Sequence, residues 1–385
     1  MSKVNDLIQK LCPNGVKFDK LENITLLQAG DRITTAMMSD DYGFDVIGGG
    51  TLPTGKYNNY NREHCVTISR AGSAGFVNWK ENKFWATDVC FTASKNNDYM
   101  DIKFVYHYLK NAQKDLQQHL YGGSMPKLEK NYLWKYPIPI PPLEVQEEIV
   151  KILDKFGELE AELEAELEAR KSQYEFWRGK LFEKENVKYM KISEFAKCCA
   201  GATPSTSHSE YWENGTIPWM SSGEVNNIEI YDTEKKITEL GYNSSSTKML
   251  PINTVVVALA GQGKTRGLVA ITRKEVCTNQ SLCGIVPDER VDNEYLFHYL
   301  QSRYKDLRRI SSGDGTRGGL NLKMINDYEV PVPSIDEQKK IINVLNRFSR
   351  LVNSYTDGLP AEIKLRRKQY EYYRNMLLSF EEVHE

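Results

Sequence analysis

A long internal repeat limits the possible folds of this chain more than any other feature. Residues 137–146 read PIPIPPLEVQ and residues 329–338 read EVPVPSIDEQ, so Gln146 and Gln338 lie 192 residues apart. Both segments continue into stretches with apolar residues every three or four positions, which is typical of amphipathic helices. A repeat that spans half the chain predicts two copies of one structural plan.

Further matches extend the repeat over most of the chain. Residues 107–109 and 298–300 both read HYL, while RKSQYEFWR at 170–178 matches RRKQYEYYR at 366–374. Each copy therefore combines a globular lobe of strands and loops, a proline-rich strand and a long helix.

The long helices are the clearest predicted elements. The first is expected from Glu144 to Phe182, because good helix formers follow Pro141-Pro142 without interruption. The second is expected to break at Gly358-Leu359-Pro360, with Pro360 in the first turn of its continuation. An apolar stripe on one helix needs a partner, so the two helices are predicted to pair.

The predicted fold class is α+β, with two similar globular mixed α/β domains joined by two long antiparallel helices in a coiled coil. The internal repeat gives this arrangement a pseudo-two-fold character. The expected domains are residues 1–142 (first lobe), 143–186 (central long helix), 187–334 (second lobe) and 335–385 (C-terminal helical region pairing with the central helix).

Composition excludes several classes of protein. The chain has 385 residues, of which 40% are hydrophobic and 26% are charged, as in ordinary globular proteins. Its mean hydropathy is −0.53, and no apolar run reaches the length of a membrane span. The N-terminus lacks the apolar core of a secretory signal, and the seven cysteines include no C-x-x-C pair. We therefore expect a protein of a reducing cytoplasm, without a membrane partner.

No motif assembles an active site. The sequence Gly261-Gln262-Gly263-Lys264-Thr265 resembles part of a phosphate-binding loop, but Ala258 stands where that loop requires its first glycine. An apolar, strand-like run follows instead of the helix that would face the phosphates. The six histidines show no metal-ligand spacing. The chain is expected to be non-catalytic, with no cofactor and no metal of its own.

The first long helix contains a four-residue repeat. Residues 158–161, 162–165 and 166–169 each read ELEA. Four residues turn a helix by about 400° and extend it by about 6 Å, so a unit can be added with only about 40° of rotation. One interpretation is a plain acidic helix surface; the other is a length adjuster between the two lobes.

Basic, aromatic and amide side chains in the lobes are candidates for contact with a nucleic acid. The segment from Lys56 to Arg62, KYNNYNR, has the mixture of residue types that grips a phosphate backbone and touches bases. Arginine or lysine can bind guanine and glutamine can bind adenine in the major groove. The predicted DNA-contact residues, all expected on loops, are Arg32, Lys56, Tyr57 and Arg70 in the first lobe, and Trp219, Ser222, Gln262, Lys264, Thr265, Arg266 and Arg317 in the second.

Taken together, these motifs resemble the specificity subunit of type I restriction-modification systems. The resemblance rests on the duplicated segments ending at Gln146 and Gln338, on the segments Gln173–Arg178 and Gln369–Arg374, and on the ELEA units. It implies two target recognition domains, each reading half of a split, asymmetric site in double-stranded DNA. It also implies helices that act as a ruler and as a docking site.

The resemblance further implies partners in a prokaryotic cytoplasm. These are two modification subunits, which bind S-adenosylmethionine and methylate adenine, and two restriction subunits, which use ATP and magnesium to translocate and cut DNA. Two alternatives from other classes remain: a coiled-coil scaffold that never touches DNA, and a nucleotide-using enzyme built on Gly261–Thr265.

Net charge initially argues against a nucleic-acid binder, because 50 basic and 52 acidic residues give −2. The acidic excess is local: residues 137–187 carry −6, residues 1–136 carry +3 and residues 188–329 are neutral. The mildly basic first lobe and neutral second lobe predict weak DNA binding by the isolated chain.

Overall fold

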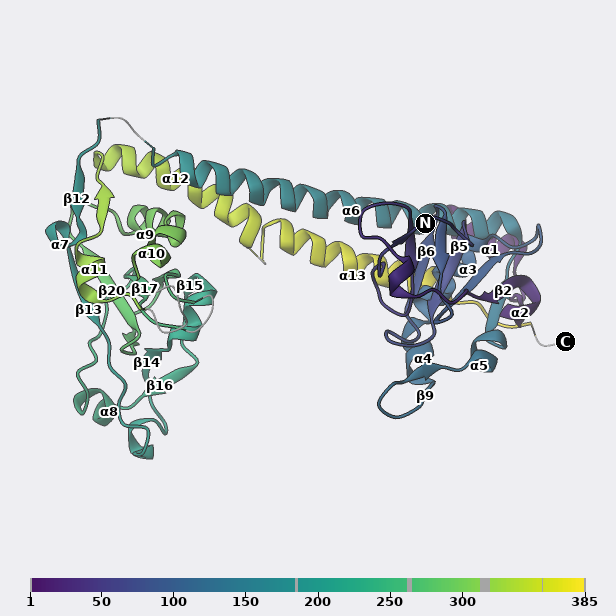
Figure 1. Cartoon of the computed structure of the whole chain (residues 1–385), viewed down its shortest axis with the longest axis horizontal. Coiled ribbons are helices and arrows are strands. Elements are labelled where there is room, and N and C mark those ends of the chain that lie inside the picture. Colours follow the sequence, from purple (N-terminus) through teal and green to yellow (C-terminus); the bar gives the residue numbers. More distant parts are fainter. Residues whose placement is uncertain (1, 184–185, 262–264, 312–318, 355, 384–385) are drawn as a thin grey trace. The chain divides into compact units, whose positions relative to one another are not determined.

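The computed structural model describes residues 2–183, 186–261, 265–311, 319–354 and 356–383. It divides into two compact units (Figure 1). Unit 1 comprises Met1–Glu164 and Glu362–Glu385, and unit 2 comprises Ala165–Ala361. The long helix α6 (Leu143–Lys180) begins in unit 1 and ends in unit 2.

Unit 1 is built on a four-stranded antiparallel sheet in the order β2-β8-β5-β6. Its central strand β5 (Cys65–Ser69) is buried along its whole length, which its β-branched residues favour. Helix α3 (Ile102–Asn111) packs on β5 and β6. A smaller sheet, β4-β3-β7, lies beside it, and β1 pairs with the proline-rich strand β11.

The strands of unit 1 are β1 (Lys17–Lys20), β2 (Thr25–Ala29), β3 (Phe44–Ile47), β4 (Lys56–Tyr57), β5, β6 (Val77–Lys80), β7 (Phe84–Ala86), β8 (Cys90–Lys95), β9 (Leu120–Tyr121), β10 (Lys127–Leu128) and β11 (Pro137–Ile140). Its helices are α1 (Ser2–Leu11), α2 (Leu21–Ile24), the 3₁₀ turn η1 (Thr35–Met37), α3, α4 (Gln113–Gln118), α5 (Lys130–Trp134), the first part of α6 and most of α13 (Leu359–Leu377).

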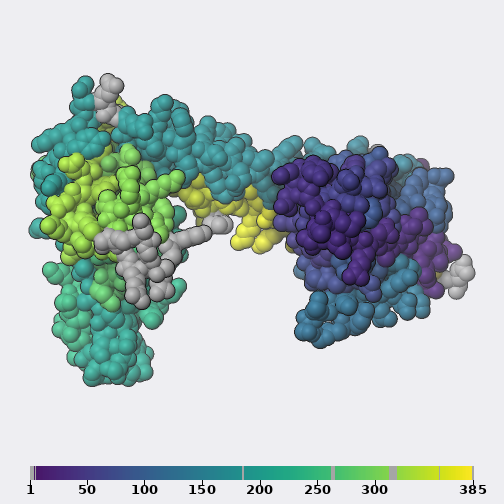
Figure 2. All heavy atoms as spheres, in the orientation of Figure 1, coloured from purple at the N-terminus to yellow at the C-terminus, as the bar shows by residue number. Residues whose placement is uncertain are grey.

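Unit 2 is built on a five-stranded sheet in the order β13-β20-β17-β18-β15. Strand β17 (Val255–Ala258) is fully buried, and helix α9 (Asn293–Ser302) packs on β17, β18 and α12. A second sheet, β16-β14-β19, is joined by α8 in the part of the unit that projects away from α12 (Figures 1 and 2).

The strands of unit 2 are β12 (Tyr189–Lys191), β13 (Ala196–Ala200), β14 (Ile217–Met220), β15 (Glu229–Ile230), β16 (Lys235–Ile237), β17, β18 (Val269–Thr272), β19 (Cys277–Thr278), β20 (Leu282–Pro287) and β21 (Glu329–Pro331). Its helices are the second part of α6, α7 (Ile192–Phe195), the 3₁₀ turns η2 (Ser209–Tyr211) and η3 (Ser222–Asn227), α8 (Glu239–Asn243), α9, α10 (Tyr304–Ile310), α11 (Leu322–Asn326) and α12 (Ile335–Asn353).

The two units share one topology, which confirms the predicted duplication. The order β2-β8-β5-β6 corresponds to β13-β20-β17-β18, and β4-β3-β7 corresponds to β16-β14-β19. In both small sheets one pair is parallel, β3 with β7 and β14 with β19. The strand pair β1–β11 likewise corresponds to β12–β21. Unit 2 adds β15 at the edge of its large sheet.

The long helices lie where the apolar spacing predicts them. The first was expected over 144–182 and spans Leu143–Lys180. The second is interrupted as predicted: α12 ends at Asn353, α13 begins at Leu359, and Pro360 stands in the first turn of α13. Proline is tolerated there because the first N–H groups of a helix have no partner within it.

Candidate nucleic-acid interface

Both lobes contain the same close chain crossing directly after the edge strand of the large sheet, β2 in unit 1 and β13 in unit 2. Gly30 follows β2, and a Cβ added there would lie 2.2 Å from the carbonyl oxygen of Ala86. Gly201 follows β13, and a Cβ there would lie 1.8 Å from the carbonyl oxygen of Thr278. Only glycine allows this approach, so the repeat preserves a backbone frame that leads into the loops.

Arg32 lies two residues beyond this crossing and is exposed. Its neighbour Asp31 is fixed: the Asp31 N–H donates to the carbonyl of Ala86 at 2.9 Å, and Asn61 Nδ2 donates to the Asp31 carboxylate at 2.8 Å. Trp85 Nε1 donates to the Asp31 carbonyl at 3.1 Å. Arg32 is thus an exposed cation on an anchored backbone, and its assignment to DNA contact stays a prediction.

Lys56 and Tyr57 do not lie on a loop, and this expectation was wrong. They form the edge strand β4, which pairs with β3, and both are half-buried. Tyr57 packs edge-on against Trp85 with ring centroids 4.9 Å apart, while Lys56 Nζ lies 3.5 Å from the carboxylate of Asp45. Through these contacts both residues stabilise the small sheet, whether or not they also contact DNA.

Arg70 follows β5 and is half-buried, with its guanidinium 5.6 Å above the ring of Phe91. Its N–H donates to the Val89 carbonyl and its carbonyl accepts from Leu128 N–H. The backbone here is therefore fixed by hydrogen bonds to two other segments, and the cation lies at the end of a buried strand.

Arg62, which ends the predicted contact segment, braces the first lobe from within. Its Nη1 donates to the carbonyl of Asn61 at 2.7 Å, its Nη2 to that of Ala29 at 3.0 Å, and its Nε to Thr92 Oγ1 at 3.1 Å. In the sequence, Arg62 belongs to a segment with the residue types of a DNA contact. In the structure, its guanidinium N–H groups instead hydrogen-bond to β2, to β8 and to the segment before β5. Only the fold reveals this positioning role.

Trp219 was predicted on a loop of the second lobe, and this expectation was wrong. It lies in strand β14 with 5% of its surface exposed, and its Nε1 donates to the carbonyl of Ala202 at 3.0 Å. Its ring also packs edge-on against Trp212, with centroids 5.0 Å apart. Trp219 is a core residue of the small sheet, because strand pairing places its ring between neighbours rather than in solvent.

The remaining second-lobe candidates divide into three groups. Ser222 begins η3 and is half-buried, and Thr265 is also half-buried. Arg266 lies in the turn before β18 but is only 6% exposed, so its side chain is not displayed at the surface as expected of a DNA-contact loop. The turn is closed by hydrogen bonds from Gly267 N–H to Ala258 and from Leu268 N–H to Thr265, which draw this part of the chain onto the sheet. Gln262, Lys264 and Arg317 lie outside the described residues.

The phosphate-loop alternative at Gly261–Thr265 finds no structural support. Strand β18 (Val269–Thr272) follows the segment and pairs with β17. A P-loop requires a helix whose N-terminal N–H groups face the phosphates. Within the described ranges, no group of His, Cys, Asp and Glu residues has the arrangement of a metal site.

The repeated glutamines anchor each long helix to its lobe. Gln146 is fully buried; its Nε2 donates to the carbonyls of Pro141 at 2.7 Å and Tyr99 at 3.0 Å, while its Oε1 accepts from Asp101 N–H at 2.8 Å. The amide therefore joins the start of α6 to the start of α3.

Gln338 repeats this arrangement in unit 2. Its Nε2 donates to the carbonyls of Pro333 and Arg290, both at 2.9 Å, and its Oε1 accepts from Asp292 N–H at 2.8 Å. The motif that reveals the repeat in the sequence is thus a lobe-to-helix clip.

A buried histidine forms a second link between each lobe and its helix. His107 Nε2 lies 2.9 Å from Asp154 Oδ1, and Lys103 Nζ lies 2.9 Å from Asp154 Oδ2. Burial alone would raise the pKa of Asp154, but the hydrogen bonds from His107 and Lys103 hold it below its ordinary value. In unit 2 His298 Nε2 lies 2.6 Å from Asn346 Oδ1, and burial lowers the pKa of His298.

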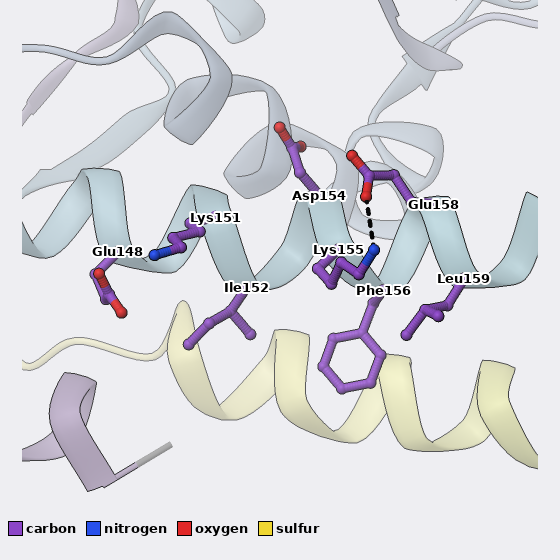
Figure 3. A pocket seen from close by; sticks show the side chains of 8 residues that line it. All are labelled: Glu148, Lys151, Ile152, Asp154, Lys155, Phe156, Glu158 and Leu159. Atoms are coloured by element: carbon purple, nitrogen blue, oxygen red, sulfur yellow. Dashed lines mark hydrogen bonds and ion pairs between the residues drawn. The ribbon is translucent and has the colours of Figure 1, made fainter.

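The first half of α6 packs against α13 within unit 1 (Figure 1). Phe156 contacts Tyr370 and Tyr373, with ring centroids 5.9 and 5.6 Å apart. Figure 3 shows Ile152 and Phe156 pointing from α6 toward the yellow helix α13. A surface pocket of about 550 Å³ is lined along α6 by Glu148, Lys151, Ile152, Asp154, Lys155, Phe156, Glu158 and Leu159.

Comparison with known protein families agrees with this duplicated architecture. The sequence model of the type I restriction modification DNA specificity domain matches residues 13–169 and again residues 184–365. The chain belongs to the type I restriction-modification specificity subunit family.

Known members of the family are similar over most of their length. The type I restriction enzyme EcoR124I/EcoR124II specificity subunit of Escherichia coli is 37% identical over 72% of this chain and 71% of its own. A specificity subunit of Haemophilus influenzae, itself named as putative, is 31% identical over 82% of each chain.

Solved structures confirm the fold of this specificity-subunit chain. The S subunit of a type I restriction-modification system from M. genitalium covers 94% of this chain and 95% of its own, with a TM-score of 0.58 and 16% identity. The HsdS subunit from Thermoanaerobacter tengcongensis gives a TM-score of 0.52 over 95% of this chain and 96% of its own, at 15% identity. Across the described parts of the chain, none of the helices is long and apolar enough to span a bilayer.

Proposed function

We propose that each lobe reads one half of a bipartite, asymmetric site in double-stranded DNA. The observation that carries the proposal is a shared backbone frame with different side chains at its loops. Gly48-Gly49-Gly50 follow β3, whereas Ser221-Ser222-Gly223 follow the corresponding strand β14. Two lobes that hold one frame but present different donors and acceptors are suited to two different half-sites.

The helices are proposed to set the distance between the half-sites. Helix α6 has 38 residues, which corresponds to about 57 Å at 1.5 Å per residue. Recognition elements one DNA turn apart need about 34–36 Å. The helix is therefore long enough for two lobes to address adjacent turns, and each ELEA unit would change its length by about 6 Å.

The chain is proposed to act as a non-catalytic subunit. Two modification subunits would dock on the helices and supply S-adenosylmethionine-dependent adenine methylation. Two restriction subunits would supply ATP- and magnesium-dependent translocation and cleavage. Membership of the family supports this division of tasks.

Removing one ELEA unit provides the sharpest test. The variant lacking Glu162–Ala165, expressed with its modification partner, should methylate the same two half-sites at a shifted spacer length. Methylome sequencing of the host reads both half-sites and the spacer. An unchanged spacer would contradict the ruler, whereas altered half-sites would contradict the assignment of readout to the lobes.

The scaffold alternative predicts a different outcome. A gel-shift series with the modification partner present, scanned across split sites, would then show no dependence on the half-site sequence.

A further inference from the structure

One arginine on α13 reaches two successive units of the repeat on α6. Arg367 Nε donates to Glu160 Oε1 at 2.5 Å, and Arg367 Nη2 donates to Glu164 Oε1. All three residues belong to unit 1. Other ion pairs of the repeat stay within α6, such as Arg170 with Glu166 and Lys171 with Glu168.

The two carboxylates occupy the same place in successive ELEA units. Residues four apart lie next to each other on one face of a helix, so a single guanidinium can bridge them. Glu168 holds that place in the third unit. The sequence thus repeats the acceptor every four residues, while α13 supplies one donor.

Apolar packing also holds the helix pair next to this contact. Phe156 lies one turn before Glu160 on α6, and Tyr370 lies nearly one turn after Arg367 on α13, so the two helices run antiparallel here. Leu159, the first leucine of the repeat, is 38% exposed. Burial of the leucine stripe is incomplete at this point, and the charged bridge supplies the next specific contact along the pair.

We propose that Arg367 and the repeated glutamates form a register lock whose contacts are restored whenever a whole four-residue unit is added or removed. Deletion of Glu162–Ala165 places Glu168 four residues after Glu160, so Arg367 again finds two carboxylates. Deletion of residues 162–164 places Leu167 there and moves the next carboxylate, Glu166, to the third residue after Glu160, about 100° around the helix from the place of Glu164. This inference rests on the proposed ruler and explains why length should change in steps of four.

A lysine at position 367 could not bridge the two glutamates equally well. A guanidinium presents several N–H donors in a fixed planar fork, whereas an ammonium is a point charge. Bridging two carboxylates from one position requires the fork.

A double-mutant cycle in the full-length chain tests the lock. Arg367→Met and Glu164→Gln should each lower the equilibrium ratio of folded to unfolded protein by about two- to five-fold at low salt, the range of partly exposed ion pairs. Together they should lower it by clearly less than the product of the two effects. The coupling should shrink as salt is raised. Independent, multiplicative effects would overturn the lock.

The same Arg367→Met change is then made in the two deletion backgrounds. In the chain lacking Glu162–Ala165 its effect should equal that in the intact chain; in the chain lacking residues 162–164 it should be smaller. Should the three-residue deletion fail to fold, Glu164→Gln in the intact chain supplies the same comparison. An effect that disappears on deletion of a whole unit contradicts the inference.

Arg366→Met is the matched control. Arg366 is the adjacent arginine, and it pairs with Glu362 and Gln369 on its own helix. Its effect should be the same in every background. A coupled lock with an unchanged methylation spacer would refute the ruler and keep the lock, whereas a shifted spacer without coupling would refute the lock and keep the ruler.

Discussion

Gln146 and Gln338 are two neutral side chains in the interior that each use one amide to join three backbone groups. Gln146 satisfies two carbonyls and one N–H where α6 meets the lobe, and Gln338 does the same where α12 begins. Buried backbone groups without partners are costly. The glutamines therefore hold the helix starts in a fixed orientation to the lobes that they leave.

Replacing Gln146 by leucine should destabilise unit 1 by about 2–3 kcal/mol, because the partner groups are left buried and unpaired. Gln338→Leu should have a similar effect on unit 2. Urea unfolding followed by tryptophan fluorescence measures both. Gln118→Leu, at an exposed position of α4, is the control and should change stability by no more than about 0.5 kcal/mol. Equal effects at Gln118 and Gln146 would contradict the clip.

His298 should make unit 2 sensitive to mild acid. Its ring is 1% exposed and faces neutral Asn346, and burial lowers its pKa below the ordinary value of 6.5. The unfolded chain therefore takes up the proton first, so stability is unaffected above about pH 6.5 and falls below it. Between pH 7.5 and 5.5 the loss from this group reaches at most about 1.4 kcal/mol.

Urea midpoints at several pH values check this expectation. His298→Asn should flatten the decline between pH 6.5 and 5.5, whatever its effect on stability at neutral pH. His208→Asn, in the same unit but at an exposed position, should leave the decline in place. A wild-type midpoint that stays constant over this range would show that the ring can be protonated without opening the structure.

Among the elements, the sequence predicts the long helices, because their apolar residues recur at a regular spacing. It does not predict which side chains become buried when strands distant in the sequence pair. The helix α6 and the break before α13 follow from residue spacing and from proline. Trp219 was expected on a loop, but pairing of β14 with β16 and β19 buries it. Arg266 is buried for a similar tertiary reason, which no local pattern reveals.

Substituting alanine for glycine should have opposite effects on stability inside helix α6 and at the chain crossing after β2. Gly157 lies inside α6, and an added Cβ would meet no atom within 4 Å, so Gly157→Ala should stabilise the chain by about 0.5–1 kcal/mol. At Gly30 the added Cβ would lie 2.2 Å from a backbone oxygen, so Gly30→Ala should destabilise unit 1. Thermal unfolding measures both, and a stable Gly30→Ala variant would show that the crossing can open.

For the whole molecule, charge is distributed in a way that a net value of −2 conceals. The acidic excess belongs to residues 137–187, and several of its glutamates pair with arginines or lysines on α6 and α13. The lobes are only mildly basic or neutral, so the isolated chain should have little non-specific attraction to a phosphate backbone. Specific binding should then depend on the assembled complex.

Substitution of Arg32 tests whether the first lobe contributes a phosphate contact in the assembled complex. Among the predicted contact residues it is an exposed cation on a fixed backbone, which suits a phosphate contact. In the complex with the modification partner, Arg32→Gln should weaken binding of specific and non-specific DNA alike. It should also reduce the slope of log affinity against log salt by about 1. Arg290→Gln, whose arginine pairs with Asp288, is the control. An unchanged salt slope for Arg32→Gln would remove Arg32 from the interface, whereas a loss confined to one half-site would identify it as a base contact.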